Sequence, residues 1–62
     1  MKIQKGQKII VEYITVAYNS YKNTKRIAGE FIGDYGNYIL IIDKWKIRRT
    51  TNKQDIVKII AV

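Results

Sequence analysis

The apolar residues of this chain fall into short runs, and the spacing of these runs is what most constrains the fold. Each run is rich in β-branched or aromatic residues, and none shows the 3.6-residue period of an amphipathic helix. The runs cover residues 7–18, 25–34, 38–42, 45–50 and 55–62. Short runs separated by polar or glycine-containing segments are typical of antiparallel β structure. We therefore predict an all-β fold with five antiparallel strands.

The segments between the runs predict the connections. Residues 19–24 interrupt the apolar pattern and should form a loop. Residues 34–37 include glycine and asparagine, which tolerate positive φ, and predict a hairpin turn. Residues 51–54 carry capping side chains and predict a tight turn or a short 3₁₀ segment. Gly29 and Gly33 are expected to bend the second strand, so that the sheet curls into a small barrel.

Length and composition limit the class of protein. A chain of 62 residues predicts a single domain spanning residues 1–62, which buries only about 60% of its unfolded surface and leaves no room for a large cavity. The sequence has no cysteine, so we expect neither disulfides nor a zinc–thiolate site, and a cytoplasmic setting is the default. No apolar run reaches the roughly 20 residues of a membrane span, and the start of the chain lacks the apolar core of a signal peptide. We expect the mature chain to begin at Met1 and to have no membrane partner.

Catalysis is poorly supported by the residue types present. The chain has no histidine and no cysteine, and Ser20 is its only serine, so no thiol and no imidazole-activated serine is available. We expect a protein that is not an enzyme and that has no cofactor and no metal site. A magnesium-dependent nuclease built from carboxylates of separate strands is the remaining enzymatic alternative.

The net charge points to a polyanion as the partner. Twelve lysine and arginine residues against five acidic residues give a formal charge of +7. A field of this size raises the local concentration of anions and speeds encounter with nucleic acid. Three alternatives compete: solubility of an apolar domain, attraction to an anionic membrane surface, and docking on an acidic protein.

The segment Lys44-Trp45-Lys46-Ile47-Arg48-Arg49 is the first candidate binding element. In an extended strand, Lys44, Lys46 and Arg48 would lie on one face and Trp45 and Arg49 on the other. If Trp45 faces outward, the cations can neutralise phosphates while the indole stacks on bases. If Trp45 faces the core, the cations remain as a phosphate strip or merely keep an edge strand soluble.

Other candidates come from the loops and turns. Lys25 and Arg26 open the second strand beside the loop and form a second positive group with Lys22. Tyr35, in the predicted hairpin turn, is a candidate stacking residue. The run 38–42 is apolar on both faces, which predicts a central strand or one that pairs with a neighbouring subunit, so a homo-oligomer stays open.

The middle of the chain, from Gly29 through Leu40, resembles the first motif of the Sm-like RNA-binding proteins. That motif is glycine, any residue, a large apolar residue, any residue, glycine, and then a turn with aspartate and asparagine leading into an apolar strand. The resemblance implies an SH3-like barrel that grips a base around a ring of subunits. It places Asn37 and, approximately, Asp34 at the turn, and Arg48 or Arg49 at the later loop arginine.

This chain departs from that pattern in its shorter turn and in having no glycine after the arginines. It also resembles, in size, charge and a tryptophan-bearing strand, the small basic chromatin proteins of thermophilic archaea. The first resemblance favours single-stranded RNA as the ligand, and the second favours duplex DNA.

The sequence thus predicts a five-stranded antiparallel SH3-like barrel that binds nucleic acid largely independently of sequence. The predicted binding residues are Lys44, Trp45, Lys46, Arg48, Arg49, Lys25, Arg26, Tyr35 and Asn37. The alternative is a protein-interaction or oligomeric assembly module whose charge serves solubility, with a virus as one possible source.

Overall fold

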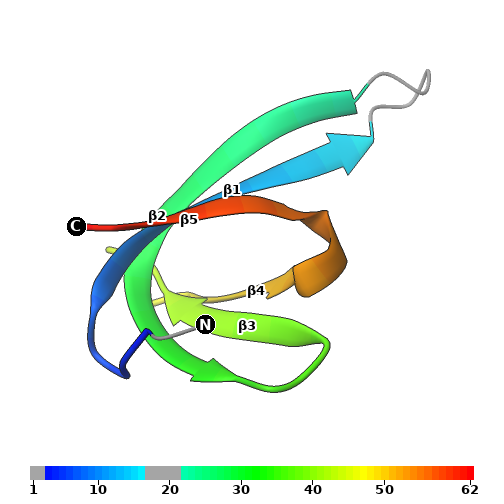
Figure 1. Ribbon diagram of the computed structural model, residues 1–62. Coiled ribbons are helices and arrows are strands. Elements are labelled where there is room, and N and C mark those ends of the chain that lie inside the picture. Colours follow the sequence, from blue (N-terminus) through cyan, green and yellow to red (C-terminus); the bar gives the residue numbers. More distant parts are fainter. Residues whose placement is uncertain (1–2, 17–21) are drawn as a thin grey trace.

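A computed structural model describes residues 3–16 and 22–62 and shows an all-β fold of five antiparallel strands (Figure 1). The elements are β1 (Lys8–Val16), β2 (Lys22–Asp34), β3 (Tyr38–Ile42), β4 (Arg48–Asn52), the 3₁₀ segment η1 (Lys53–Asp55) and β5 (Ile56–Ala61). They form one sheet in the order β4-β3-β2-β1-β5. The predicted all-β class with five antiparallel strands is therefore confirmed. The sheet is open, because β4 and β5 lie at its two edges.

The long strand β2 belongs to both halves of the sheet. Its first part pairs with β1, from Val16 opposite Lys22 to Lys8 opposite Glu30. Its last part pairs with β3, and the register shifts between Phe31 and Gly33. Figure 1 shows β2 curving between the two halves. Gly29 and Gly33, at which the sequence predicts a bend, lie in this region.

Gly29 has a specific role in this bend. A Cβ atom at Gly29 would lie 2.5 Å from the carbonyl oxygen of Ile42, at the end of β3. Only a residue without a side chain allows the two backbones to come so close. Gly29 thus lets the β3–β4 connection lie directly against the middle of β2.

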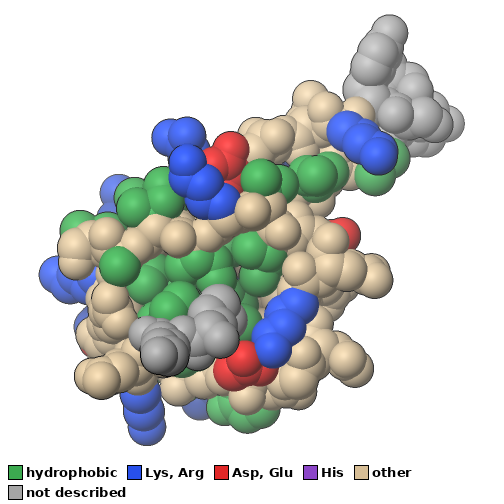
Figure 2. Space-filling view, viewed as in Figure 1, with side chains coloured by type: hydrophobic (Ala, Val, Ile, Leu, Met, Phe, Trp, Pro, Cys, Tyr) green, Lys and Arg blue, Asp and Glu red, His purple; other side chains and the backbone are tan. Residues whose placement is uncertain are grey.

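The core lies between the two halves of the bent sheet. Ile9 and Val11 of β1, Phe31 of β2, and Ile39 and Ile41 of β3 are buried, and four partly buried isoleucines pack around them. Alternate residues of β1 and of β3 are buried, as the two-residue period of a strand requires. In Figure 2 apolar side chains are visible between the two halves, where the sheet does not close.

Strand β3 is a central strand. It pairs with β2 on one side and with β4 on the other. Of the two alternatives that the sequence left open for this run, the central strand is confirmed, and its backbone groups are paired within the chain. Unpaired backbone edges belong to β4, to β5 and to the ribbon of residues 14–16 and 22–28.

Two predicted boundaries also differ from the structure. Residues 22–24 were expected in a loop but extend β2, because they pair with residues 14–16 of β1 in a two-stranded ribbon that needs no apolar side chains. The rest of the predicted loop, and the end of the first predicted strand at residues 17–18, lie outside the described residues. The predicted turn after β4 is confirmed as η1, although Thr51 and Asn52 still belong to β4.

The predicted basic strand at residues 45–50 is the main error in the secondary structure. Residues 43–47 form a turn, and β4 begins only at Arg48. The cause is the side chain of Asp43, which bonds to backbone groups of the residues that follow it.

Candidate nucleic-acid interface

Asp43 organises the connection between β3 and β4, which we call the Trp45 turn (residues 43–47). Its Oδ1 accepts hydrogen bonds from the backbone N–H groups of Trp45 and Ile47, each at 3.0 Å. Its Oδ2 accepts one from Nε of Arg49, also at 3.0 Å. The backbone closes the turn with a hydrogen bond from the Lys46 N–H to the Asp43 carbonyl oxygen. A single carboxylate thus fixes the path of the whole turn.

The Asp43 carboxylate is ionised in this setting. Only 7% of the residue surface is exposed, and this burial acts to raise the pKa of Asp43. The N–H of Ile47, the Arg49 guanidinium and the N–H of Trp45 favour the charged form and outweigh burial, so the pKa lies below its ordinary value. The turn is therefore held by a charged acceptor, which makes stronger hydrogen bonds than a neutral one.

The turn presents its side chains to solvent. Trp45 is 66% exposed and Ile47 is 50% exposed. Nζ of Lys44 lies 4.5 Å from the centroid of the Trp45 ring, within cation–π range. Of the two orientations that the sequence left open for Trp45, the structure has the outward one.

The three cations expected on one strand face are arranged differently. Lys44 and Lys46 belong to the turn, where Lys46 has a φ of 64°, and only Arg48 lies in a strand. A positive φ is uncommon outside glycine, so the alternation of an extended strand does not hold here. All three side chains are nevertheless exposed and lie at the same end of the β3–β4 hairpin.

The two neighbouring arginines of β4 have different surroundings. Arg49 pairs with Asp43 and lies opposite the buried Ile41. Arg48 lies opposite Ile42 and makes no ion pair within the described part of the chain. Arg48 is thus a free cation, whereas Arg49 also has a structural task.

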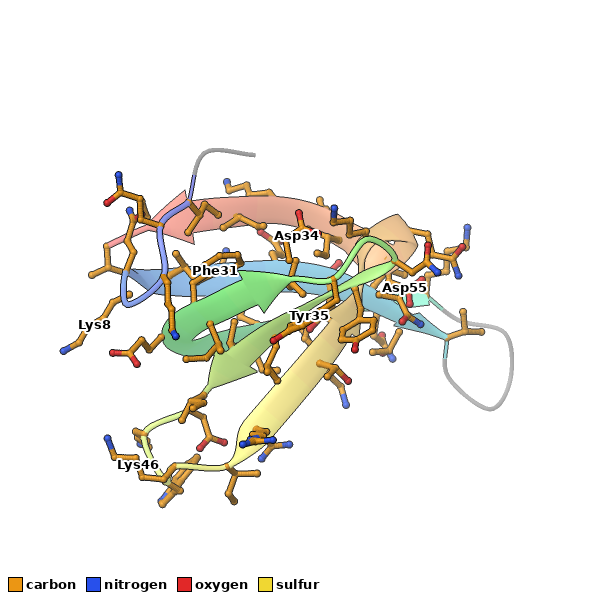
Figure 3. The ribbon with its side chains drawn as sticks, turned by 90° about the horizontal axis from the view of Figure 1, so that it is seen from below. Lys8, Phe31, Asp34, Tyr35, Lys46 and Asp55 are labelled. Atoms are coloured by element: carbon orange, nitrogen blue, oxygen red, sulfur yellow. The ribbon has the colours of Figure 1, made fainter. Side chains whose placement is uncertain are left out.

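Lys25 and Arg26 do not form a joint positive group. They are consecutive residues of β2, so their side chains lie on opposite faces of the ribbon. Arg26 lies opposite Glu12 and forms an ion pair with it at 3.9 Å. In Figures 1 and 3 the ribbon that carries both residues extends away from the end where the Trp45 turn lies. The structure does not bring them together with Lys46.

The hairpin turn at residues 34–37 is confirmed and carries a second aromatic feature. Gly36 has a φ of 92°, as the sequence predicted for this turn. The rings of Tyr35 and Tyr38 are stacked with their centroids 5.3 Å apart, and Tyr35 is 55% exposed. Gly33 leaves room for the Tyr35 ring, which would lie 3.2 Å from a Cβ atom at that position.

The cation at this turn is Lys53, which the sequence analysis missed. Nζ of Lys53 lies 2.7 Å from Oδ2 of Asp34, and its backbone N–H donates to the carbonyl oxygen of Asn37. The hydrogen bond from Lys53 and a further one from the N–H of Gly36 lower the pKa of Asp34.

The resemblance matched Arg48 or Arg49 to the family's loop arginine, and the structure does not place either of them beside Asn37. Tyr38, the residue after Asn37, pairs with Asn52, whereas Ile42 pairs with Arg48. The two arginines therefore lie at the other end of the β3–β4 ladder. No local signal in the sequence singles out Lys53, because its position depends on how β4 returns along β3.

The remaining positive charge is spread over the surface. Three acidic residues are used in ion pairs with Arg26, Arg49 and Lys53. Among the residues that the structure describes, the cations without such a partner are Lys5, Lys8, Lys22, Lys25, Lys44, Lys46, Arg48 and Lys58. Figure 2 shows basic side chains in several separate places.

Within residues 3–16 and 22–62 no group of three or more acidic residues could hold a metal ion. The same part of the chain contains no helix that is long and apolar enough to cross a membrane. No protein-family model, no curated protein and no solved structure matches this chain.

Proposed function

We propose that this protein is a non-enzymatic nucleic-acid-binding protein that contacts the phosphate backbone with little sequence selectivity. The observation that carries the proposal is the Trp45 turn, where an exposed indole stands among the exposed cations Lys44, Lys46 and Arg48. Cations beside a stackable aromatic ring are the combination that nucleic acids require from a binding surface.

The turn is well suited to this task because it is already ordered. Asp43 holds the backbone on both sides of Trp45, so little conformational freedom is left to lose when a ligand binds. A base that stacks on an aromatic side chain contributes about 1–3 kcal/mol. Each neutralised phosphate adds a salt-dependent contribution through counterion release.

Low sequence selectivity follows from the chemistry of Lys44, Lys46 and Trp45. Lysine acts as a point charge and binds phosphate without reading the pattern of a base edge. Stacking on Trp45 accepts every base, because every base has a π-face. Duplex DNA and single-stranded RNA are the two ligands to compare first.

The test follows the fluorescence of Trp45 during titration with duplex DNA and with single-stranded RNA at two salt concentrations. Trp45 is the only tryptophan, so a change in emission reports on this turn alone. We expect quenching that weakens with salt, with a slope of about 0.9 per neutralised phosphate on duplex DNA. Unchanged emission, together with no binding of a labelled oligonucleotide at low salt, would refute the proposal.

A pair of charge-reversal variants tests the location. Lys46→Glu with Arg48→Glu should reduce the salt slope and the affinity. Lys5→Glu with Lys58→Glu changes the total charge equally but alters exposed cations outside the Trp45 turn. Equal losses in the two double variants would show that only the overall charge matters and would remove the turn from the proposal.

The rival function is an oligomeric assembly module. The open edges of β4 and β5 favour it, because exposed strand edges are templates for pairing with another chain. Arg48 and Arg49 on β4 and Lys58 on β5 oppose it, since charges on an edge discourage pairing. Sedimentation distinguishes the two: a stable oligomer without affinity for polyanions would support assembly, and a monomer with salt-sensitive binding would support the proposed function.

We further propose an SH3-like architecture and a cytoplasmic location. The strand order, with η1 connecting the two edge strands, supports the architecture that the Sm-like resemblance implies. A cytoplasmic location fits a nucleic-acid ligand. Formation of a ring that binds uridine-rich RNA would support the Sm-like relationship itself.

A further inference from the structure

A groove with an apolar floor lies next to the Trp45 turn, on the outer side of the sheet. Its volume is about 510 Å³, within the range of ligand-binding clefts. Ile10, Ala28, Ile42 and Val62 contribute apolar surface to its lining. The groove exists because the end of β3 passes so close to Gly29 that the turn stands beside the middle of β2.

Lysines from two distant parts of the chain line the same groove. Lys8 comes from β1, and Lys44 and Lys46 come from the Trp45 turn. Figure 3 shows Lys8 and Lys46 at the same end of the molecule, Lys8 on the sheet and Lys46 on the projecting turn. None of the three forms an ion pair within the described residues.

Two acidic side chains also line the groove, but the net charge of the lining side chains stays positive. Asp43 is occupied by Arg49 and by the backbone of the turn. Glu30 lies opposite Lys8 in the β1–β2 ladder and is exposed. Among the lining side chains, the three lysines therefore outnumber Glu30, the one carboxylate that is not otherwise bonded.

We propose that this groove takes an unpaired base of a single strand, while Lys8, Lys44 and Lys46 bind the flanking phosphates. The inference rests on the proposed function and narrows its ligand to single-stranded nucleic acid. An apolar floor with a cationic rim matches a chain whose bases are apolar on their faces and whose backbone is anionic. A duplex keeps its bases stacked and paired, so one would have to be flipped out at a cost of a few kcal/mol.

Lys44 lies between the groove and the Trp45 indole and contributes to both. Lys44 lies over the Trp45 ring and also lines the groove. One strand can therefore place a base on Trp45 and a neighbouring base in the groove, with a phosphate near Lys44 between them.

An acidic peptide fits the groove less well. Extended peptides bind mainly by adding a strand to an open sheet edge. The edge strands β4 and β5 contribute no residue to the groove lining, and Val62 lies just beyond β5. The groove therefore does not run along the edge of β4 or of β5.

The experiment compares three labelled ligands of equal length: oligothymidylate, an abasic phosphodiester strand, and a duplex. Binding is measured by fluorescence anisotropy at one low salt concentration. Because stacking on Trp45 would also separate these two strands, they are compared, here and in the groove variants below, in the Trp45→Ala background. There we expect oligothymidylate to bind at least about tenfold more tightly than the abasic strand, a difference of ~1.4 kcal/mol. It should also bind more tightly than the duplex.

Ala28→Leu tests the groove directly, because Ala28 is exposed and the larger side chain fills the floor without changing the charge. Val57→Leu on β5 is the matched control, since Val57 is also exposed but does not line the groove. Ala28→Leu should remove most of the difference between oligothymidylate and the abasic strand and leave affinity for the abasic strand unchanged. The urea midpoints of both variants are measured to confirm that they fold.

The outcomes separate this inference from the proposed function. If oligothymidylate and the abasic strand bind equally with the expected salt dependence, the groove inference is wrong and the proposed function remains. If none of the three ligands binds, both are wrong. A competition with polyglutamate tests the alternative ligand. If polyglutamate displaces oligothymidylate from the natural protein but not from Ala28→Leu, the groove binds an acidic peptide and the inference is overturned.

Discussion

The hydrogen bond from Nε of Arg49 to Oδ2 of Asp43, at 3.0 Å, joins the beginning of β4 to the turn that precedes this strand. The other oxygen of the same carboxylate holds the backbone of Trp45 and Ile47. Asp43 is therefore the residue on which the exposed indole depends. This dependence makes Asp43 important for the proposed binding, even though it is buried and acidic.

Replacing Asp43 should weaken both the fold and the binding of nucleic acid. Asp43→Ala removes all three side-chain hydrogen bonds, whereas Asp43→Asn keeps an acceptor but loses the charge. We expect the urea midpoint to fall most in Asp43→Ala and less in Asp43→Asn. Asp55→Asn, an acidic residue outside the turn, is the control and should change the midpoint least.

Stability should decrease in acid. The pKa values of Asp43 and Asp34 are lowered in the folded protein, so their contribution is fully present above the unfolded value of about 4. It is lost as the pH falls through the lower folded-state pKa values. Unfolding midpoints measured from pH 7 down to pH 2 should be constant above about pH 5 and fall below about pH 4. A midpoint that rose on acidification would contradict the assigned ion pairs.

Trp45→Ala should separate binding from stability. The side chain is 66% exposed, so its loss should change the free energy of unfolding by no more than about 0.5 kcal/mol. Affinity for nucleic acid should fall by about 1–3 kcal/mol if one base stacks on the indole. Val57→Ala, at another exposed apolar residue, should change neither quantity. Equal affinity of the Trp45→Ala variant and the natural protein would exclude stacking.

Gly29→Ala and Gly33→Ala form a matched pair on β2. The new Cβ at residue 29 would collide with backbone, the Ile42 carbonyl oxygen at 2.5 Å, and we expect a loss of about 1–3 kcal/mol in stability. At residue 33 the nearest atoms belong to the exposed Tyr35 ring, which can move aside, so the loss should be smaller. Chemical denaturation of both variants tests this order, and the reverse order would show that the close approach at Gly29 is not needed.

A substitution in the core should lower stability more than any of the changes above. Ile41 is fully buried between the halves of the sheet, and Ile41→Ala should cost about 2–5 kcal/mol. In a domain of this size such a loss is enough to unfold much of the population. Circular dichroism at increasing temperature would show a lower or absent transition, and an unchanged melting temperature would contradict the core described above.

Much of the fold could be predicted because its signals are local. The β-branched and aromatic residues of β1 and β3 favour an extended strand, and this preference depends on each residue type alone. The turn at Gly36 was predictable for the same reason, since glycine is the residue that adopts positive φ at least cost. The number of strands and the antiparallel arrangement followed from these signals.

The site was less predictable, because its main features depend on contacts between parts of the chain. The sequence by itself determined that exposed cations would surround a single tryptophan, through composition and order alone. Residues 43–47 form a turn because Asp43 binds the N–H groups of Trp45 and Ile47. Lys46 takes a positive φ in this turn, and its residue type does not predict that conformation. The register of β4 against β3 put Lys53, and not an arginine, beside Asp34. The bend of β2 put Lys8 and Lys46 around one groove, since a contact between distant residues exists only once the chain has folded.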